Sequence, residues 1–200
     1  MSLRAYQAGL ARLVAEPGFP SRLRDRGSAA LPRGLEPRER ERLLRLASEP
    51  GVALTATLVA SFRLGKVLKA LPLTCTLIGK DRLRLELRAF WRRHPPTSFF
   101  TFDEAADFAG HLARRARAVP GLLDVLTLER ALLELRRPGA GGRPAEARSI
   151  RLRHDPRSLL PSLVAGRRPR RLRRRTCRVT VRLGADGAPS FAAQAGGRGV

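Results

Sequence analysis

The densest group of side chains that could do chemistry is a run of arginines near the C-terminal end of the chain. Guanidinium groups bind phosphate and carboxylate through paired hydrogen bonds. Like charges at this density repel one another, so the loop 167–175 is expected to stay extended unless an anion neutralises it. The run predicts an anion-binding or peptide-binding loop, although a solvated loop set by the codon bias of a GC-rich genome explains it equally well. Within 12 residues stand Arg167, Arg168, Arg170, Arg171, Arg173, Arg174, Arg175 and Arg178.

Residue types that support catalysis or metal binding are few and scattered. The histidines are His94, His111 and His154, and none has the spacing of a metal motif such as HExxH. Cys75 and Cys177 form neither a CxxC motif nor a disulfide framework. The sequence also lacks a nucleophile elbow, a Walker loop and a dinucleotide-binding glycine motif. We therefore expect no catalytic residue, no metal ligand and no cofactor, and a protein that is not an enzyme.

Aromatic residues gather around a Pro-Pro turn. They are Phe90, Trp91, Phe99, Phe100, Phe102 and Phe108. One interpretation is a core that pins two helices together. The other is a docking surface for a partner protein, since exposed aromatic residues are frequent interface anchors. In that second case we expect Trp91, Phe99 and Phe100 to make the contact.

The charge balance narrows the choice of partner. A net charge of +23 favours nucleic acid, an anionic membrane surface or an acidic peptide. Between residues 150 and 190 there is no aromatic residue for base stacking, and the segment 156–164 is too apolar for a recognition helix. Nucleic-acid binding is therefore expected to be nonspecific and sensitive to salt.

The N-terminus does not resemble a signal peptide, and the longest apolar stretch, Gly51–Phe62, ends at Arg63. That stretch is too short to cross a bilayer. We expect a cytoplasmic protein without a membrane partner.

Hydrophobic periodicity predicts that the first 137 residues are helical. The segment 17–35 is expected to be irregular, and Pro72 and Gly79 are expected to break the chain. Residues 81–93 fit both a strand and a helix, and the abundance of good helix formers favours the helix. The helices are expected after Ser2 as far as Pro17, and then at about 36–47, 52–70, 81–93, 104–118 and 122–136.

The chain changes character after a linker at residues 138–147, which is rich in Gly and Pro. Residues 148–200 hold 14 Arg and two Asp, which is about half of the net charge. Alternation predicts a β-α-β-β order, with elements at 149–153, 156–164, 178–183 and 190–194. We therefore expect an α+β protein, in which an all-helical domain (1–137) precedes a small, basic β-α-β-β domain (148–200).

Several segments together resemble a known family. They are Leu64–Cys75, Phe90-Trp91, Pro95–Phe108, Val119–Leu122, Leu128-Glu129 and His154–Gly166. This pattern of apolar and turn residues, spread over about residues 50–166, is similar to the helical partner proteins that accompany multinuclear non-haem iron oxidative enzymes in ribosomally made peptide biosynthesis, as in methanobactin maturation.

The resemblance implies an accessory subunit. Such a protein docks on a separate iron-dependent oxidative enzyme subunit and recognises the leader of the precursor peptide through a small winged-helix-like C-terminal domain, with which the predicted β-α-β-β order is compatible. A leader peptide that adds a strand to an exposed sheet edge would be a standard mode of recognition. We therefore expect a non-catalytic accessory protein, and the alternative is a nonspecific nucleic-acid-binding protein.

Overall fold

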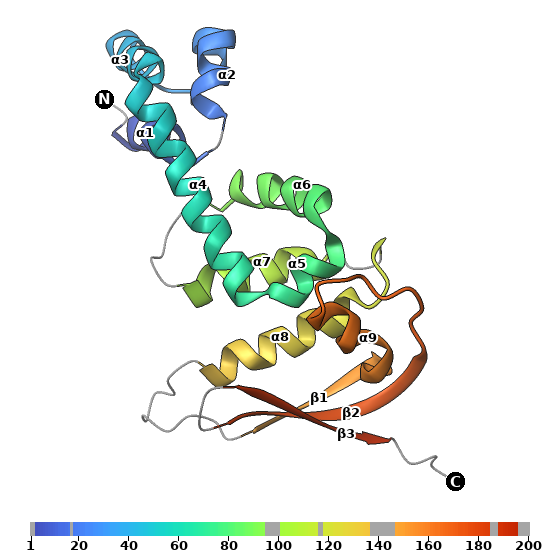
Figure 1. The fold of residues 1–200 in the computed structure, drawn as a ribbon. Coiled ribbons are helices and arrows are strands. Elements are labelled where there is room, and N and C mark those ends of the chain that lie inside the picture. Colours follow the sequence, from blue (N-terminus) through green and yellow to red (C-terminus); the bar gives the residue numbers. More distant parts are fainter. Residues whose placement is uncertain are drawn as a thin grey trace, which may run out of the picture. The chain divides into compact units, whose positions relative to one another are not determined.

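A helical region precedes a small antiparallel sheet in this protein (Figure 1). The computed structural model describes residues 3–16, 18–94, 101–115, 118–136, 147–184 and 188–195. The helices are α1 (Leu3–Ala15), α2 (Phe19–Arg26), α3 (Pro37–Ser48), α4 (Pro50–Ala70), α5 (Pro72–Ile78), α6 (Lys80–Trp91), α7 (Thr101–Ala113), α8 (Leu122–Arg136) and α9 (Pro156–Val164), with a 3-10 turn η1 (Gly27–Ala30). The strands are β1 (Ala147–His154), β2 (Arg174–Leu183) and β3 (Pro189–Ala195). The predicted α+β class and the β-α-β-β order are confirmed.

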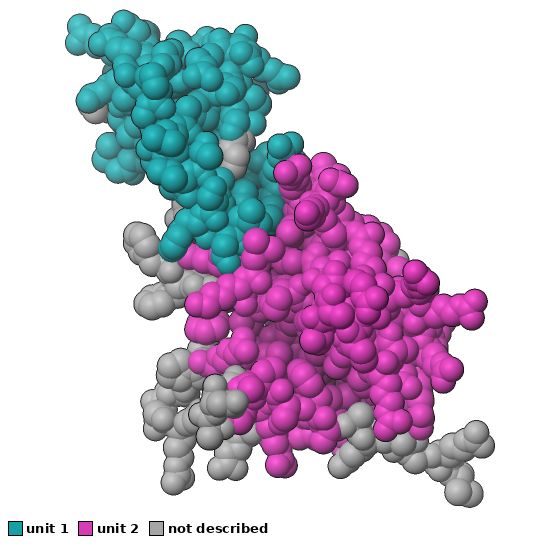
Figure 2. Space-filling view, viewed as in Figure 1, with its two compact units in different colours: residues 1–65, 87–99 teal, residues 66–86, 100–200 magenta. Residues whose placement is uncertain are grey.

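The chain divides into two compact units (Figure 2). The helical unit comprises residues 1–65 and 87–99, and the sheet unit comprises residues 66–86 and 100–200. The predicted linker between the two domains is at residues 138–147, of which 138–146 lie outside the described residues. The compact units divide elsewhere, because α8 packs directly against β1 and β2 and so belongs with the sheet.

The core of the helical unit includes a segment that was expected to be irregular. Residues 19–26 form α2, and η1 follows it. Gly18 precedes α2 with a left-handed φ of 75°, and Pro20 occupies the first turn, where proline needs no backbone donor. Phe19 and Leu23 are then fully buried against residues of α1 and α3. The prediction was wrong because Gly and Pro were taken as breaks, whereas here they begin a helix.

A second short helix, α5, occupies the segment between Pro72 and Gly79. Pro72 lies in its first turn, and Gly79 ends it with a φ of 74°. The Glu129 carboxylate of α8 accepts the backbone N–H groups of Leu73, at 2.6 Å, and Thr74, at 3.0 Å. A buried carboxylate thus satisfies donors that the start of a helix leaves unpaired. Since this acceptor is more than 50 residues away in sequence, local patterning did not reveal the helix.

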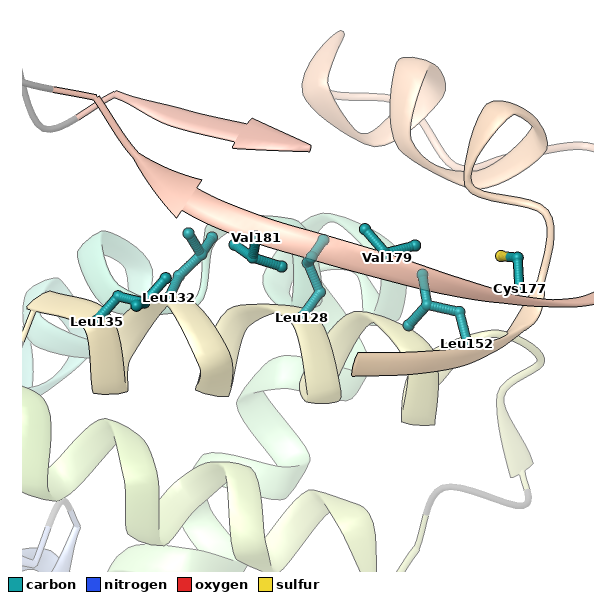
Figure 3. Close-up of a cluster of buried hydrophobic side chains, with 7 residues drawn as sticks. All are labelled: Leu128, Leu132, Leu135, Leu152, Cys177, Val179 and Val181. Atoms are coloured by element: carbon teal, nitrogen blue, oxygen red, sulfur yellow. The ribbon is translucent and has the colours of Figure 1, made fainter. Parts of the chain in front are cut away.

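The sheet has the order β1-β2-β3, and both pairs of strands are antiparallel. Helix α8 covers one face. Figure 3 shows three leucines of α8 directed at the strands. The cluster consists of Leu128, Leu132, Leu135, Leu152, Cys177, Val179 and Val181, each 7% exposed or less. Alternation along the strands therefore leaves the side chains at the intervening positions on the opposite, open face.

Glu129 is expected to make the stability of the sheet unit depend on pH. Burial raises the pKa of Glu129 from its ordinary value of 4.5 to about 7. The folded protein therefore holds this proton more tightly than the unfolded chain does. The resulting stabilisation is complete below about pH 4.5 and is lost as the pH rises through about 7. The whole shift corresponds to about 3 kcal/mol.

Urea denaturation at several pH values tests this expectation. Between pH 5 and pH 8, the free energy of unfolding should fall more steeply for the unmodified protein than for a Glu129→Gln variant. The difference between the two profiles should reach about 1–3 kcal/mol. Parallel profiles would show that Glu129 does not titrate in this range.

Candidate functional site

The arginine run is divided between a loop and a strand. The five arginines between positions 167 and 173 belong to the loop that precedes β2, whereas Arg174, Arg175 and Arg178 are part of β2. The expectation of an extended loop over 167–175 is therefore corrected at its end, because β2 begins at Arg174 rather than near Arg178. The pairing of His154 with Arg174 extends β2 in this direction.

Three arginines of the run line a cavity of about 1010 Å³ in the sheet unit, which we call the arginine cavity. Its cationic side chains come from the start of α6, the loop and β2, and Asp81 is the one carboxylate among its described lining residues. The lining comprises Leu77, Ile78, Lys80, Asp81, Arg82, Ala118, Val119, Pro120, His154, Arg168, Pro169, Arg170, Leu172 and Arg174. A lining with this excess of cations favours an anionic ligand.

Arg168 fastens the loop to the junction between α5 and α6. Its Nη2 group donates a hydrogen bond to the carbonyl oxygen of Ile78. A Cβ atom on Gly79 would overlap this guanidinium group and displace it from its present position. The positive φ of Gly79 also favours glycine at this position. The loop arginines are therefore held over the cavity by a specific contact 90 residues away in sequence.

Asp124, in the first turn of α8, fixes the histidine of the cavity wall. Its carboxylate is 4% exposed and accepts the backbone N–H groups of Arg153, at 2.9 Å, and His154, at 3.0 Å. The same carboxylate lies 2.6 Å from Nδ1 of the His154 ring. Asp124 therefore joins the end of β1 to α8 and sets the orientation of the imidazole. This partner of His154 was not predicted, because Asp124 lies 30 residues away in the sequence.

The open face of the sheet carries a second set of arginines, which we call the arginine face. Its members are Arg151, Arg153, Arg178 and Arg182, which are exposed and alternate with the buried positions. Arg151 stands directly opposite Arg178 in the β1–β2 register. Like charges in this position destabilise a pair of strands. None of the described strand residues is acidic, so the sheet itself provides no compensating charge.

A shallow hollow of about 780 Å³ adjoins the arginine face. It is lined by Arg151, Arg153, His154, Arg174, Arg175 and Thr176. Together with the cavity and the face, it accounts for five of the eight arginines that the sequence singled out. The other three, Arg167, Arg171 and Arg173, are exposed and line none of these surfaces.

Strand β1 is the edge of the sheet next to α8. Between them lies a groove of about 300 Å³, which we call the edge groove. Its lining is Ala113, Leu123, Leu126, Thr127, Arg130, Ala131, Glu134, Arg148, Ser149 and Ile150. Arg148 and Glu134 approach to 3.5 Å across the groove, and both are half-exposed. An exposed ion pair of this kind contributes little stability, so it presents little obstacle to a ligand.

Of the predicted docking residues, Trp91 lies in the interior. Its side chain is 8% exposed, and the guanidinium group of Arg63 lies 5.1 Å from its ring centroid. Arg63 also donates to the carbonyl oxygen of His94 at 2.8 Å. Phe99 and Phe100 lie outside the described residues. Within the described part of the cluster, burial of Trp91 agrees with the core interpretation.

Three exposed apolar side chains of the helical unit follow one another along α4. Leu54, Leu58 and Phe62 recur every four residues and are 61%, 60% and 61% exposed. We call these three residues the α4 stripe. Their spacing was visible in the sequence, but the spacing alone does not show which side of a largely apolar helix is exposed.

Helix α4 also exceeds the expected length of the apolar stretch. It continues beyond Arg63 to Ala70, and an 18-residue window within its 21 residues reaches a mean hydropathy of 1.4, sufficient by length and composition to cross a membrane. A single helix of this kind is weak evidence for insertion, because core helices of other proteins pass the same test.

Two further titratable side chains, those of His111 and Cys75, are buried. Nε2 of His111 lies 3.1 Å from Glu86 Oε2, and burial lowers the pKa of this histidine. Burial raises the pKa of the Cys75 thiol to about 12, which keeps it protonated at neutral pH. Within the described ranges, no three His, Cys, Asp or Glu side chains are grouped as a metal site.

Comparisons with family models, curated proteins and solved structures find no match for this chain.

Substitution of Gly79 tests the attachment of the loop. Gly79→Ala should destabilise the protein by roughly 1–2 kcal/mol through the left-handed backbone alone, with a further cost from displacement of Arg168. In an Arg168→Ala background, only the backbone cost should remain. Urea denaturation of the four proteins in this double-mutant cycle provides the measurement. An unchanged cost of Gly79→Ala in both backgrounds would show that Arg168 is not positioned over Gly79.

Proposed function

We propose that this protein is a non-catalytic accessory subunit whose sheet unit binds an acidic peptide as an added strand on β1. The observation that carries this proposal is the position of the β1 edge, with the edge groove on one side of the sheet and the arginine face on the other. Backbone groups on an edge strand are a template for an extended peptide.

The two sides of β1 define the sequence that such a peptide should have. Successive side chains of a strand point to opposite faces. On one side, the added strand would meet the edge groove, which contains Leu123, Leu126 and Ile150. On the other side, it would lie beside Arg151 and Arg153. The best ligand is therefore a segment in which apolar and acidic residues alternate.

The resemblance to partner proteins of iron-dependent oxidative enzymes supports a more specific role. In that role, the peptide is the leader of a precursor peptide, and the chemistry belongs to a separate iron-containing subunit. The α4 stripe is the surface that we assign to docking on this subunit, because Trp91 is buried. A net charge of +23 opposes self-association and favours a partner of opposite charge.

Nonspecific nucleic-acid binding is the second candidate, and the arginine face is the observation that favours it. Four exposed arginines without a neighbouring strand carboxylate would attract a phosphate backbone. This binding should weaken steeply with salt, whereas a peptide held by backbone hydrogen bonds and apolar contacts should retain affinity near physiological ionic strength.

Two synthetic peptides of equal composition test the peptide site. One alternates Val and Glu over ten residues, and the other holds the same residues in two blocks. At about 0.15 M salt, fluorescence anisotropy should show that the alternating peptide binds at least about tenfold more tightly. Arg151→Gln combined with Arg153→Gln should reduce its affinity by a similar factor.

The matched control removes the same charge elsewhere. Arg167→Gln combined with Arg171→Gln alters two exposed arginines that line none of the three surfaces. This variant should bind the alternating peptide nearly as well as the unmodified protein. Equal losses in both variants, or equal affinity for both peptides, would reduce the interaction to general charge attraction.

A substitution on α4 tests the docking surface. Leu58→Asp should abolish recovery of a stoichiometric iron-binding protein from nuclease-treated extracts of the native host, because a charge would enter an apolar contact. Thr57→Asp places the same charge on a neighbouring exposed position and should leave recovery unchanged. Both variants should keep the circular dichroism spectrum of the unmodified protein. Recovery of nucleic acid alone, lost on nuclease treatment, would contradict the accessory role.

A further inference from the structure

We propose that the arginine cavity is a second binding site, separate from the peptide site, for a small organic anion that carries at least two neighbouring phosphate groups. The cavity and the edge groove have no lining residue in common. The inference therefore stands whether or not the peptide proposal is correct.

The number of cationic side chains in the cavity lining indicates how much negative charge the ligand carries. Five cationic side chains line the cavity against one carboxylate, Asp81. The five cations less Asp81 give the lining a net charge of +4, and a single phosphate, with at most two negative charges, would compensate only half of it. Two or three linked phosphates match it more closely, and each can accept paired hydrogen bonds from a guanidinium group.

The five cations have different roles. Arg168 is engaged with the carbonyl oxygen of Ile78. Arg82 lies 3.5 Å from the carbonyl oxygen of Ala118 and 3.8 Å from the Glu86 carboxylate. No such contact is found for Lys80, Arg170 and Arg174 within the described residues, so these three are available to a ligand. The first pair builds the wall, and the other three provide the charge.

A further feature favours an anion at this position. Lys80 is the first residue of α6, a helix of 12 residues, so the positive end of the helix dipole lies beside the cavity lining. His154 adds a polar ring to the same wall, and Asp124 fixes its orientation through Nδ1 at 2.6 Å.

The apolar part of the lining indicates that the phosphate groups are attached to an organic body. Leu77, Ile78, Val119, Pro120 and Leu172 form an aliphatic wall. A cavity of about 1010 Å³ is the size that holds a cofactor-sized molecule rather than one inorganic ion. None of its described lining residues is Phe, Tyr or Trp, so a large aromatic platform for a nucleobase is not found among them. An aliphatic diphosphate or triphosphate is the class of ligand that fits both the cationic and the aliphatic parts of the lining.

Calorimetric titration with sodium tripolyphosphate measures the phosphate contribution directly. The full-length protein is compared with two triple variants of equal charge. The cavity variant combines Lys80→Gln, Arg170→Gln and Arg174→Gln. The control variant combines Arg167→Gln, Arg171→Gln and Arg173→Gln, three exposed residues in or beside the same loop that do not line the cavity. Ionic strength is held at about 0.15 M with sodium chloride.

The cavity variant should lose at least about tenfold in affinity for tripolyphosphate, and the control variant should lose less than about threefold. Thermal denaturation gives an independent readout, because a ligand that binds only the folded state raises the melting temperature. Tripolyphosphate should raise it for the unmodified and control proteins but not for the cavity variant. Circular dichroism of both variants without ligand shows whether they are folded.

Three outcomes would overturn the inference. Equal losses in the two variants would mean that the anion responds only to the overall charge. Citrate binding as tightly as tripolyphosphate would exclude the phosphate class. Displacement of tripolyphosphate by the alternating peptide would make the cavity part of the peptide site. That last result leaves the proposed function intact, whereas failure of the peptide to bind at all leaves the cavity unaffected.

Discussion

The burial of α8 is the constraint on which the sheet unit depends. One side of this helix packs its leucines against β1 and β2, and its polar residues reach two other segments. Glu129 satisfies the first donors of α5, and Asp124 holds the end of β1 and the ring of His154. Ten of its 15 residues are buried, Asp124 and Glu129 among them. The packing of α8 therefore fixes where these two carboxylates lie relative to their partners. The cavity, the open face and the edge groove are all placed by this one helix.

The sequence predicted best the helices whose first and last residues are set by their neighbours in the chain. The bounds of α8 and α9 were predicted closely, because Pro-Gly, Asp-Pro and Gly signals stand at their ends. The segment 81–93 was ambiguous, and its helix formers correctly favoured α6. The failures were α2 and α5: Pro20 was assigned to an irregular segment and Pro72 to a break, but each lies in the first turn of a helix. Both helices are held by contacts with distant residues, which a local pattern does not contain.

The sequence predicted most of the arginines of the candidate sites but not how they are divided between two surfaces. The sequence singled out eight arginines, and five of them line the cavity or lie on or beside the open face. Their separation into two surfaces depends on where β2 begins and on the contact between Arg168 and Ile78. Lys80 and Arg82 were not selected, since nothing in their spacing relates them to residues 90 positions later. The same limitation applies to Trp91, which packs against Arg63 of another helix, α4.

The division of the chain has a consequence for the design of fragments. The sheet unit is discontinuous, because residues 87–99 belong to the helical unit and separate residues 66–86 from the remainder. A fragment of residues 148–200, although it contains all but the first residue of β1 and the whole of β2 and β3, would lack α8 and expose Leu152, Val179 and Val181 to water. A fragment that begins at Phe100 would lack α5 and leave the Glu129 carboxylate without its donors. Transfer of the peptide-binding or anion-binding surface to another protein therefore requires a graft that carries both segments.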